Sequence, residues 1–329
     1  NISNTTDCTA ILVAYLEGLI NNCHTKGGSI TGKSDIGSLC GYLSNGTITN
    51  CSSSTSLNGR GSVGGIVGSF YAGKIEFCHN TAAITGTSNG LGGIVGYIGS
   101  GTATNSNCTI TNCYNTAPIT TTGSSSGGII GFCSSGTISK CYSTGTATGS
   151  SRVGGLVGYC NSEVINSVSY SYSLQSPVIG EYTANSINTF TGVSTKSATQ
   201  LQTQSTFSGW DFVGEAVNGT YDYWAITSGF NGGYPTLGNF AATCTNGVVD
   251  LNQQPADNVY SWYKVSGTKL TEGTDYIVDG GITKFLKLPG SKVYCTITNA
   301  TFPTWIARTN TVTVDKVVEP NITFVSELS

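Results

Sequence analysis

The sequence predicts an all-β chain that begins with a parallel β-solenoid and ends with a β-sandwich. Three observations lead to this prediction. A glycine-rich pentapeptide recurs in series, short strand-like runs fill the intervals between its copies, and a Cys, Trp, Cys order marks the C-terminal region. The chain has 329 residues, of which 38% are hydrophobic and only 9% charged. The hydrophobic fraction and the strict repeat favour a folded chain over a disordered one.

The repeat is the pentapeptide GGIVG, which begins at Gly64 and Gly92 and returns as GGIIG at Gly127 and GGLVG at Gly154. The spacings are 28, 35 and 27 residues. Periods of this size are typical of solenoids, in which one unit buries its apolar face only against copies stacked on it. Paired glycines suit either a turn with positive φ or a close approach of neighbouring coils. No helix pattern follows them, as a phosphate-binding loop would require.

Two further copies precede Gly64 and bring the total to about six coils of 27–28 residues. Residues 37–48 align on residues 64–75 without gaps, and residues 9–24 align on residues 64–79. The second alignment places Ile11, Leu12, Tyr15 and Ile20 on Ile66, Val67, Phe70 and Ile75. Residues 9–20 also fit an amphipathic helix, so a degenerate coil and a helical cap both remain open.

Each coil contains three strand-like segments that are separated by glycine and polar turns. In the third copy they are GGIVGSF from Gly64, GKIEFCH from Gly73 and NTAAITG from Asn80. Runs rich in Ile, Val, Thr and aromatic residues between turn signals predict strands. Parallel stacking at about 4.8 Å per coil would give six coils a length of about 29 Å. We therefore expect residues 1–172 to form the solenoid.

The repeat fades after Asn161, and residues 173–240 are expected to cap the solenoid with a cluster of aromatic side chains. An open solenoid end exposes strand edges and core, which bulky side chains can cover. The same aromatic residues could instead form a platform on which sugars stack. The candidates for such a platform are Trp210, Trp224 and Tyr234.

Residues 241–318 change character and contain alternating strand patterns such as VYSWYK from Val259 and KVYCTIT from Lys292. Cys244, Trp262 and Cys295 follow the Cys, Trp, Cys order of an immunoglobulin-type sandwich, in which the tryptophan packs on an inter-sheet disulfide. Tyr294 directly precedes the second cysteine, which does not fit a tyrosine corner. Residues 319–329 form a C-terminal tail.

The units GGIVGY, GGLVGY and GGIIGF resemble the GLUG-motif repeats of large surface proteins and adhesins. The segments TQLQTQSTFSGWDFVG and YWAITSGFNGGYPTL look like the region that commonly closes such repeats, and VYSWYK with KVYCTIT is similar to immunoglobulin-like modules of secreted and adhesive proteins. The resemblance covers residues 9 to 318. It implies a right-handed parallel β-solenoid and an exported, surface-associated, non-catalytic role.

Composition points to an extracellular protein. The formal net charge of -3 gives no electrostatic reason to expect nucleic acid as a partner, and no apolar run is long enough for a membrane helix. The chain begins at Asn1 and has no methionine, so we expect a mature product whose targeting segment has been removed. Eight Asn-X-Ser/Thr sequons could carry glycans: Asn1, Asn4, Asn45, Asn50, Asn107, Asn218, Asn299 and Asn321.

The twelve cysteines also fit an oxidising compartment. Equivalent residues in adjacent coils have Cα atoms about 4.8 Å apart, which is within the reach of a disulfide. The predicted pairs are Cys133 with Cys160, Cys23 with Cys51, and Cys244 with Cys295. A stack of buried free thiols is the alternative for the solenoid cysteines.

We expect no catalytic residue, metal site or cofactor. His24 and His79 occupy equivalent places two coils apart, about 10 Å from each other, which is too far for a shared metal ion. Hydrolases and lyases on parallel β-helices need clustered carboxylates or bases. The acids of the coils, Glu17, Asp35, Glu76 and Glu163, are scattered.

The sequence thus predicts a non-enzymatic extracellular structural protein. Our first hypothesis is a subunit of a surface fibre that binds copies of itself through sheet edges and terminal tails, since residues 321–328 alternate like a strand. The alternative is an adhesin or carbohydrate-binding module that binds other surface proteins or glycans. A polysaccharide-degrading enzyme is a remote third possibility.

Overall fold

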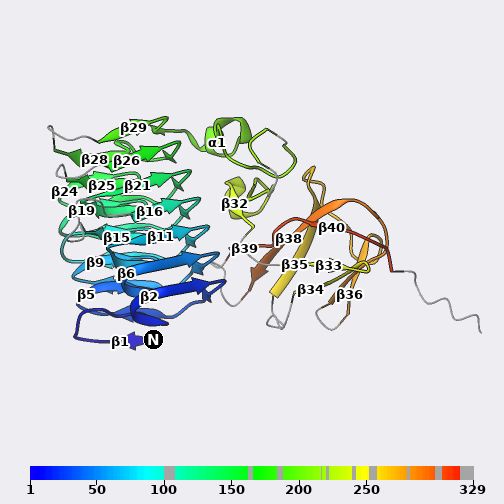
Figure 1. The fold of residues 1–329 in the computed structure, drawn as a ribbon, viewed down its shortest axis with the longest axis horizontal. Helices are drawn as coiled ribbons and strands as arrows, with labels where there is room; N and C mark the ends of the chain where they lie inside the picture. Colours follow the sequence, from blue (N-terminus) through cyan, green and yellow to red (C-terminus); the bar gives the residue numbers. More distant parts are fainter. Residues whose placement is uncertain are drawn as a thin grey trace, which may run out of the picture.

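The computed structural model describes residues 1–99, 108–161, 166–183, 188–215, 217–219, 222–238, 242–251, 258–279, 282–300 and 306–318. Figure 1 shows a stack of flat coils, a short non-repetitive segment beside it and a C-terminal pair of sheets. The predicted all-β class, with a parallel β-solenoid of about six coils and antiparallel sheets at the C-terminus, is confirmed.

The widest sheet of the solenoid has twelve strands, all paired in parallel. In pairing order they are β28 (Ile179–Tyr182), β25 (Val157–Cys160), β20 (Ile130–Cys133), β15 (Val95–Ile98), β10 (Val67–Phe70), β6 (Cys40–Thr49), β11 (Gly73–Glu76), β16 (Cys108–Thr111), β21 (Gly136–Ser139), β26 (Asn166–Ser169) and β29 (Thr189–Thr191), and β2 (Val13–Asn21) also pairs with β6. The long strands β2 and β6 each span two columns of shorter strands.

Three narrower sheets complete each coil. The seven-stranded sheet contains β3 (His24–Thr25), β7 (Ser52–Ser53), β12 (His79–Asn80), β17 (Tyr114–Asn115), β22 (Tyr142–Ser143), β27 (Tyr172–Ser173) and β30 (Ser194–Thr195). The six-stranded sheet contains β1 (Ile2–Ser3), β4 (Ser29–Thr31), β8 (Ser56–Gly59), β13 (Ile84–Gly86), β18 (Ile119–Thr121) and β23 (Ala147–Thr148). The five-stranded sheet contains β5 (Ser34–Gly37), β9 (Gly61–Gly64), β14 (Leu91–Gly92), β19 (Ser124–Gly127) and β24 (Ser151–Gly154).

The glycines of the repeat allow coils to approach one another closely. Their φ angles are not positive, so a turn is not the reason for them. A Cβ on Gly64 would lie 2.0 Å from the carbonyl oxygen of Val67 and 2.6 Å from the backbone nitrogen of Gly96 in the next coil. No side chain fits at such a site. Between the glycines, Ile66 and Val67 point into the core and are fully buried.

The first coil begins with a strand, as the degenerate-coil interpretation predicts, and not with a helix. The gapless alignment of residues 9–24 is nevertheless wrong by one residue over its first part. Leu16 pairs with Leu43, and a bulge between Leu16 and Glu17 restores the expected register before Ile20 pairs with Ile48. Leu16 therefore points into the core in the place that the alignment gave to Tyr15, and Tyr15 is exposed.

Residues 196–238 run along the side of the solenoid (Figure 1). They contain the short helix α1 (Ala198–Leu201), two 3-10 turns, η1 (Gln204–Thr206) and η2 (Asn231–Gly233), and a two-stranded sheet of β31 (Trp224–Ala225) and β32 (Thr236–Leu237). Ser197 begins α1 with a capping box, in which its hydroxyl accepts the N–H of Gln200. We call residues 196–238 the side segment.

The C-terminal module is a sandwich of two four-stranded antiparallel sheets. One contains β33 (Cys244–Thr245), β34 (Val248–Asp250), β37 (Ile282–Phe285) and β36 (Tyr276–Asp279), and the other β35 (Asn258–Lys264), β38 (Lys292–Asn299), β39 (Ile306–Arg308) and β40 (Val312–Thr313). Trp262 lies in the shared core, with its ring centroid 5.0 Å from that of Phe285 and its Nε1–H donated to Thr283 Oγ1 at 3.1 Å. Trp262 thus lies at the centre of the sandwich, but without the inter-sheet disulfide on which the sequence predicts it to pack.

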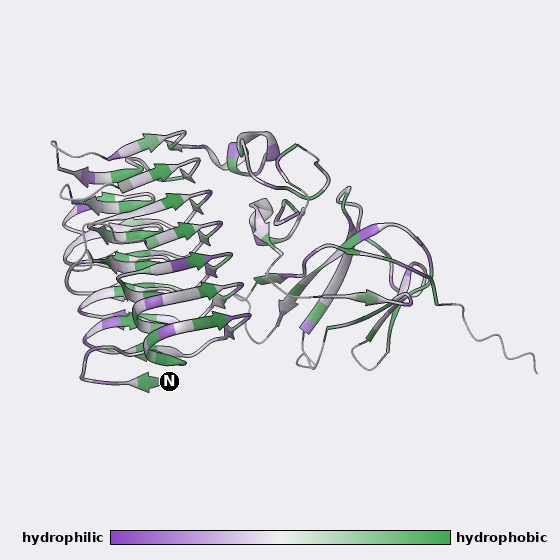
Figure 2. Ribbon diagram, viewed as in Figure 1, coloured by the Kyte–Doolittle hydropathy of each residue, from purple (hydrophilic) through white to green (hydrophobic). Residues whose placement is uncertain are grey.

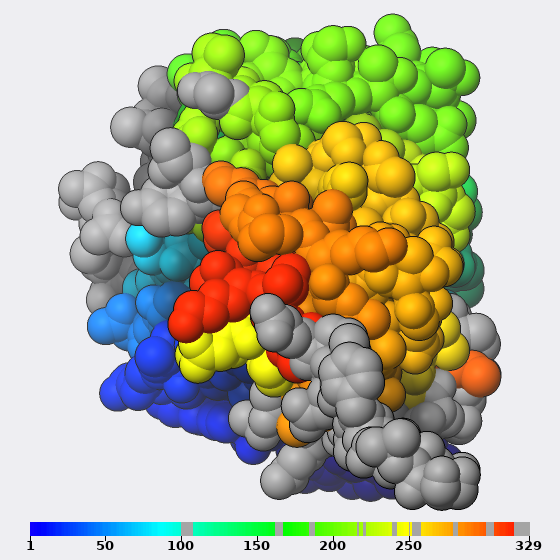
Figure 3. All heavy atoms as spheres, turned by 90° about the vertical axis from the view of Figure 1, so that its right-hand side faces the viewer, coloured from blue at the N-terminus to red at the C-terminus, as the bar shows by residue number. Residues whose placement is uncertain are grey.

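Apolar residues form continuous bands inside the coils and strongly hydrophilic positions are sparse (Figure 2). In Figure 3, which faces the sandwich, green and yellow-green parts of the last coils and the side segment lie above the sandwich, and the first coils (blue) lie below it. On this face the sandwich lies over the middle of the stack.

Candidate functional site

The aromatic residues of the side segment form a buried junction against the seven-stranded sheet. Trp210 and Trp224 lie with ring centroids 4.6 Å apart and contact a column of tyrosines, Tyr114, Tyr142 and Tyr172. Their indole N–H groups are donated to the solenoid: Trp224 Nε1 to Asn112 Oδ1 at 3.2 Å and Trp210 Nε1 to the carbonyl of Tyr170 at 3.0 Å. The cluster thus packs on the side of the stack.

This placement corrects the predicted sugar-stacking platform. Trp210 is 1% exposed and Trp224 is fully buried, so neither indole offers a face to a ligand. Tyr234 is partly buried against the same cluster. Stacking of a sugar on an aromatic ring requires an accessible ring face, and Trp210 and Trp224 use theirs for each other and for the tyrosine column.

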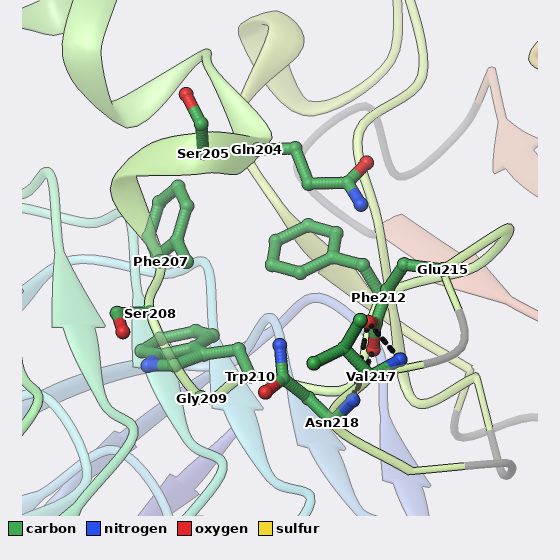
Figure 4. Close-up of a pocket in the computed structure, with 10 residues that line it drawn as sticks. All are labelled: Gln204, Ser205, Phe207, Ser208, Gly209, Trp210, Phe212, Glu215, Val217 and Asn218. Carbon is green, nitrogen blue, oxygen red and sulfur yellow. Dashed lines mark hydrogen bonds between the residues drawn. The ribbon is translucent and has the colours of Figure 1, made fainter.

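A pocket of 390 Å³ lies at the outer edge of the junction (Figure 4). The rings of Phe207, Trp210 and Phe212 line it, but each is at most 2% exposed. The carboxylate of Glu215 accepts the backbone N–H groups of Val217 and Asn218 at 2.8 and 3.1 Å, as the dashed lines show. Glu215 therefore orders its own loop and has no second carboxylate beside it among the lining residues, as acid–base hydrolysis would require.

The two histidines hold structural positions. His79 stacks on Tyr114 with ring centroids 4.6 Å apart, and its Nε2–H is donated to the carbonyl of Ile306 in the sandwich at 2.8 Å. His24 Nδ1 lies 2.8 Å from Ser52 Oγ. Burial lowers the pKa of His79 to about 3 and that of His24 to about 4, so both rings are neutral at pH 7.

Arg308 joins the sandwich to the side segment. It is fully buried, and its Nη2 donates to the carbonyls of Asp222 and Tyr223 at 3.3 and 2.8 Å. The guanidinium also lies over the ring of Tyr294, 5.1 Å from its centroid. Burial lowers its pKa to about 10, so it stays charged. Together with His79, this residue makes the solenoid, side segment and sandwich one connected body.

None of the predicted disulfides is present. The twelve cysteines all lie within the described residues and form no disulfide, neither Cys23 with Cys51, nor Cys133 with Cys160, nor Cys244 with Cys295. The alternative of a buried thiol stack holds for the column of cysteines that directly precedes the strands of the seven-stranded sheet. There Cys51, Cys78, Cys113 and Cys141 each donate the S–H to the carbonyl two residues earlier, at 2.9 to 3.2 Å. The thiols serve as donors to carbonyls at the ends of strands, and burial raises the pKa of Cys113 well above its usual range.

The scattered acids remain apart in the structure. Glu17 accepts hydrogen bonds from Tyr15 and Ser44, Asp35 accepts one from Ser69, and Glu76 lies 3.9 Å from Lys74 Nζ. Glu163 lies outside the described residues. Within the part of the chain that the structure describes, no group of three His, Cys, Asp or Glu residues could hold a metal ion.

Six of the eight sequons lie in the described residues. The asparagines Asn1, Asn45 and Asn218 are exposed, Asn4 and Asn50 are partly buried, and Asn107 and Asn321 lie outside the described residues. Asn299 is 3% exposed and donates to Asn258 Oδ1 at 2.6 Å. Its burial contradicts its prediction as a glycan acceptor in the folded chain.

An aromatic ladder on the outer face of the twelve-stranded sheet is a feature that the sequence analysis missed. Its members are Tyr15, Tyr42, Tyr71, Tyr97, Phe132 and Tyr159, with successive ring centroids 4.7 to 6.2 Å apart. Burial between its neighbours raises the pKa of Tyr71 to about 12. A signal was available: an aromatic residue follows the last glycine of the repeat at Tyr42, Tyr97, Phe132 and Tyr159.

Both ends of the solenoid leave strand edges without a partner among the described residues. At the N-terminal end, β2 pairs only with β6 and β3 only with β7. At the other end, β28, β29 and β30 pair only with β25, β26 and β27. Unpaired N–H and C=O groups in a row form a template for another strand. These ends are the candidate functional site of the protein.

Fold and surfaces define the class: a parallel β-solenoid with an antiparallel sandwich joined to it by hydrogen bonds of buried side chains. Comparison of the chain with family models, with curated proteins and with solved structures finds no match. No helix among the described residues has the length and apolarity needed to cross a membrane.

Proposed function

We propose that this chain is a non-enzymatic extracellular structural protein, a subunit of a surface fibre or filament that assembles through sheet edges and terminal tails. The observation that carries the proposal is the pair of unpaired parallel edges at the two ends of the solenoid. The buried junction supports it, because one connected body transmits force better than modules on a flexible linker.

The secreted, surface-associated setting is supported by sequence. The repeats resemble GLUG-motif repeats, and the sandwich with its central Trp262 is similar to immunoglobulin-like modules of adhesive proteins. Exposed sequon asparagines, Asn1, Asn45 and Asn218, are accessible to glycosylation in a secretory route. Low charge fits a partner of the same composition, since a net charge of -3 opposes self-association only weakly.

Electron microscopy tests this function. The native material and the purified chain are expected to form elongated polymers, and a chain that lacks residues 320–329 is expected to form none if the tail links subunits. Tail-deleted polymers equal to those of the full chain would remove the tail from the proposal. A full chain that stays monomeric at every concentration would overturn the fibre function.

A second candidate function is binding of a neutral glycan by the lateral aromatic ladder. Ring edges and hydroxyls repeat along the solenoid axis, and of the charged side chains beside them Arg152 Nε pairs with Glu181 Oε1 at 3.1 Å. A glycan array tests it with Tyr97→Ala, against Tyr114→Phe as a buried control. Binding that Tyr97→Ala abolishes would favour this candidate, and an array without any binding would exclude it.

A further inference from the structure

We infer that the two ends of the solenoid bind each other, so that β28, β29 and β30 of one copy pair in parallel with β2 and β3 of a second copy. This inference rests on the proposed structural function and names its contact. The partner is a second copy of this chain, because the two ends fit each other in phase, in side-chain column and in chemistry.

The two ends match in the order in which the chain passes through the four sheets. Each coil passes through the twelve-, seven-, six- and five-stranded sheets in that order. The last solenoid strand, β30, lies in the seven-stranded sheet, and the first, β1, lies in the six-stranded sheet, which follows it. A second copy placed on the C-terminal end of the stack therefore continues the helical path without an omitted or repeated side.

The columns also match across the gap. The strand register places equivalent residues of successive coils in columns. One column consists of Leu16, Leu43, Phe70, Ile98, Cys133, Cys160 and Tyr182. A second column consists of Ile20, Ile48, Ile75, Ile110, Ile138, Val168 and Phe190. Addition of a second copy would set its Leu16 on Tyr182 and its Ile20 on Phe190. Apolar columns of this kind already form the core between every pair of coils.

Both ends expose several large apolar side chains close together, which is unusual for a solvent-exposed protein surface. Leu12 is 48% exposed at the N-terminal end, beside Ile11, and Tyr182 is 54% exposed at the other end, where its ring lies 5.6 Å from that of Phe190. Burial of such side chains stabilises a contact in proportion to the apolar area removed from water. Edge pairing and apolar burial therefore act together at one surface.

Several charged side chains near the ends have partners within their own copy, which limits repulsion across the contact. Asp7 pairs with Lys33 at 3.3 Å, and Arg152 pairs with Glu181 while it lies over the ring of Tyr159. By contrast, the last strand of the six-stranded sheet is closed. The amide of Gln175 accepts the N–H of Ala147 at 2.7 Å and donates to its carbonyl at 2.9 Å, in the place of a further strand.

Gln175 shows that this chain can block an edge with a side chain. No described residue does so for β28, β29 or β30. The open edges of β28, β29 and β30 lie in the columns that β2 and β3 of a second copy would extend, while β24, the last strand of the five-stranded sheet, also pairs only with β19. Residues 321–328 of another copy are the competing occupant of these edges, and the experiment below separates the two.

The experiment uses two full-length variants, Leu12→Lys and Tyr182→Lys, each of which places a charge at one end only. Both positions are about half exposed in the single chain, so we expect each variant to fold, which circular dichroism and thermal melting would verify. Val217→Lys, at a 90% exposed site of the side segment, is the matched control. Ile11→Lys and Phe190→Lys replace either variant that does not fold.

Sedimentation velocity is the readout. Val217→Lys is expected to polymerise like the unmodified chain, and each end variant alone is expected to sediment as a monomer of 34.0 kDa. Mixed in equal amounts, the end variants retain one intact N-terminal end and one intact C-terminal end between them. The mixture is therefore expected to stop at a dimer of twice the monomer mass.

Three results would overturn the inference: end variants that polymerise like the unmodified chain, an end variant that forms a dimer with itself, or a mixture that stays monomeric. The first would leave the fibre function intact and assign the contact elsewhere, with the tail as occupant if tail deletion alone abolishes polymers. A monomeric unmodified chain is the separate result that removes the fibre function itself.

Discussion

At the scale of single residues, the repeated glycines decide how closely the coils stack. The sequence left two roles open for them, a positive φ or a close approach, and only coordinates separate the two because both need the missing Cβ. At the first and last glycine of each pentapeptide, the atoms that exclude a Cβ are backbone atoms, which cannot move aside as a flexible side chain can.

We predict that Gly92→Ala destabilises the solenoid by about 3 kcal/mol, because its Cβ would lie 2.0 Å from the carbonyl oxygen of Val95 and 2.6 Å from the nitrogen of Gly131. Gly136→Ala is the control, since its nearest neighbour would be the carbonyl oxygen of Cys108 at 3.1 Å. Urea unfolding measures both variants. Equal free energies of unfolding would show that the glycine column does not set the coil contact.

The thiol column leads to a second residue-scale prediction. Ser171 takes the place of cysteine in the coil that follows Cys141 and donates its hydroxyl to the carbonyl of Ser169 at 2.8 Å. We therefore expect Cys113→Ser to keep the free energy of unfolding within about 1 kcal/mol, because the same donor remains. Cys113→Ala loses the donor to the carbonyl of Thr111 and is expected to be less stable than the serine variant. The reverse order in thermal melting would contradict this role.

At the scale of elements, the sequence was enough to predict which segments form strands. The register of those strands and the surfaces that they contact could not be predicted from it. Spacing and turn residues located the strands of each coil, since period and composition are local properties. The bulge between Leu16 and Glu17 depends on which side chain best fills the core below Leu43, a tertiary choice. Burial of Trp210 and Trp224 likewise depends on Tyr114, Tyr142 and Tyr172, which lie far away in sequence. The repeat in the sequence was enough to predict the solenoid ends as a candidate site. The apolar columns that match between the two ends could be found only from the strand register in the structure.

The link between β12 and β39 is expected to weaken in acid. The pKa of His79 is about 3 in the folded chain, below the value of 6.5 for an unperturbed histidine, because burial disfavours the charged ring. The unfolded state therefore binds more protons between pH 6.5 and 3, and stability falls as the pH falls through this window. At pH 5 the loss from His79 is about 2 kcal/mol relative to neutral pH.

Urea unfolding at pH 7.5 and pH 5 measures this loss. His79→Gln keeps a donor for the carbonyl of Ile306 and has no titrating ring, so its stability is expected to depend less on pH by the same amount. His24→Gln should retain the part of the pH dependence that belongs to His79. A His79→Gln variant with the full acid loss would contradict the assignment.

At the scale of the whole molecule, the junction couples solenoid and sandwich into one unfolding unit. We predict that the unmodified chain melts in a single calorimetric transition and that Trp224→Ala splits it into two. The change removes a buried indole and its bond to Asn112 Oδ1, at a cost of about 3–5 kcal/mol. Val217→Ala, at an exposed site, is the control. A single transition in Trp224→Ala would show that coupling lies elsewhere in the interface.

The parallel direction of every strand pair in the stack has a consequence for growth. Two parallel edges pair only when their chains run the same way, so an end that exposes β2 can accept β28 but not another β2 in the same geometry. Such a contact is heterologous and does not close on itself as a twofold dimer does. An assembly built on it would be polar, with every subunit oriented alike and with two chemically different tips that add subunits at different rates.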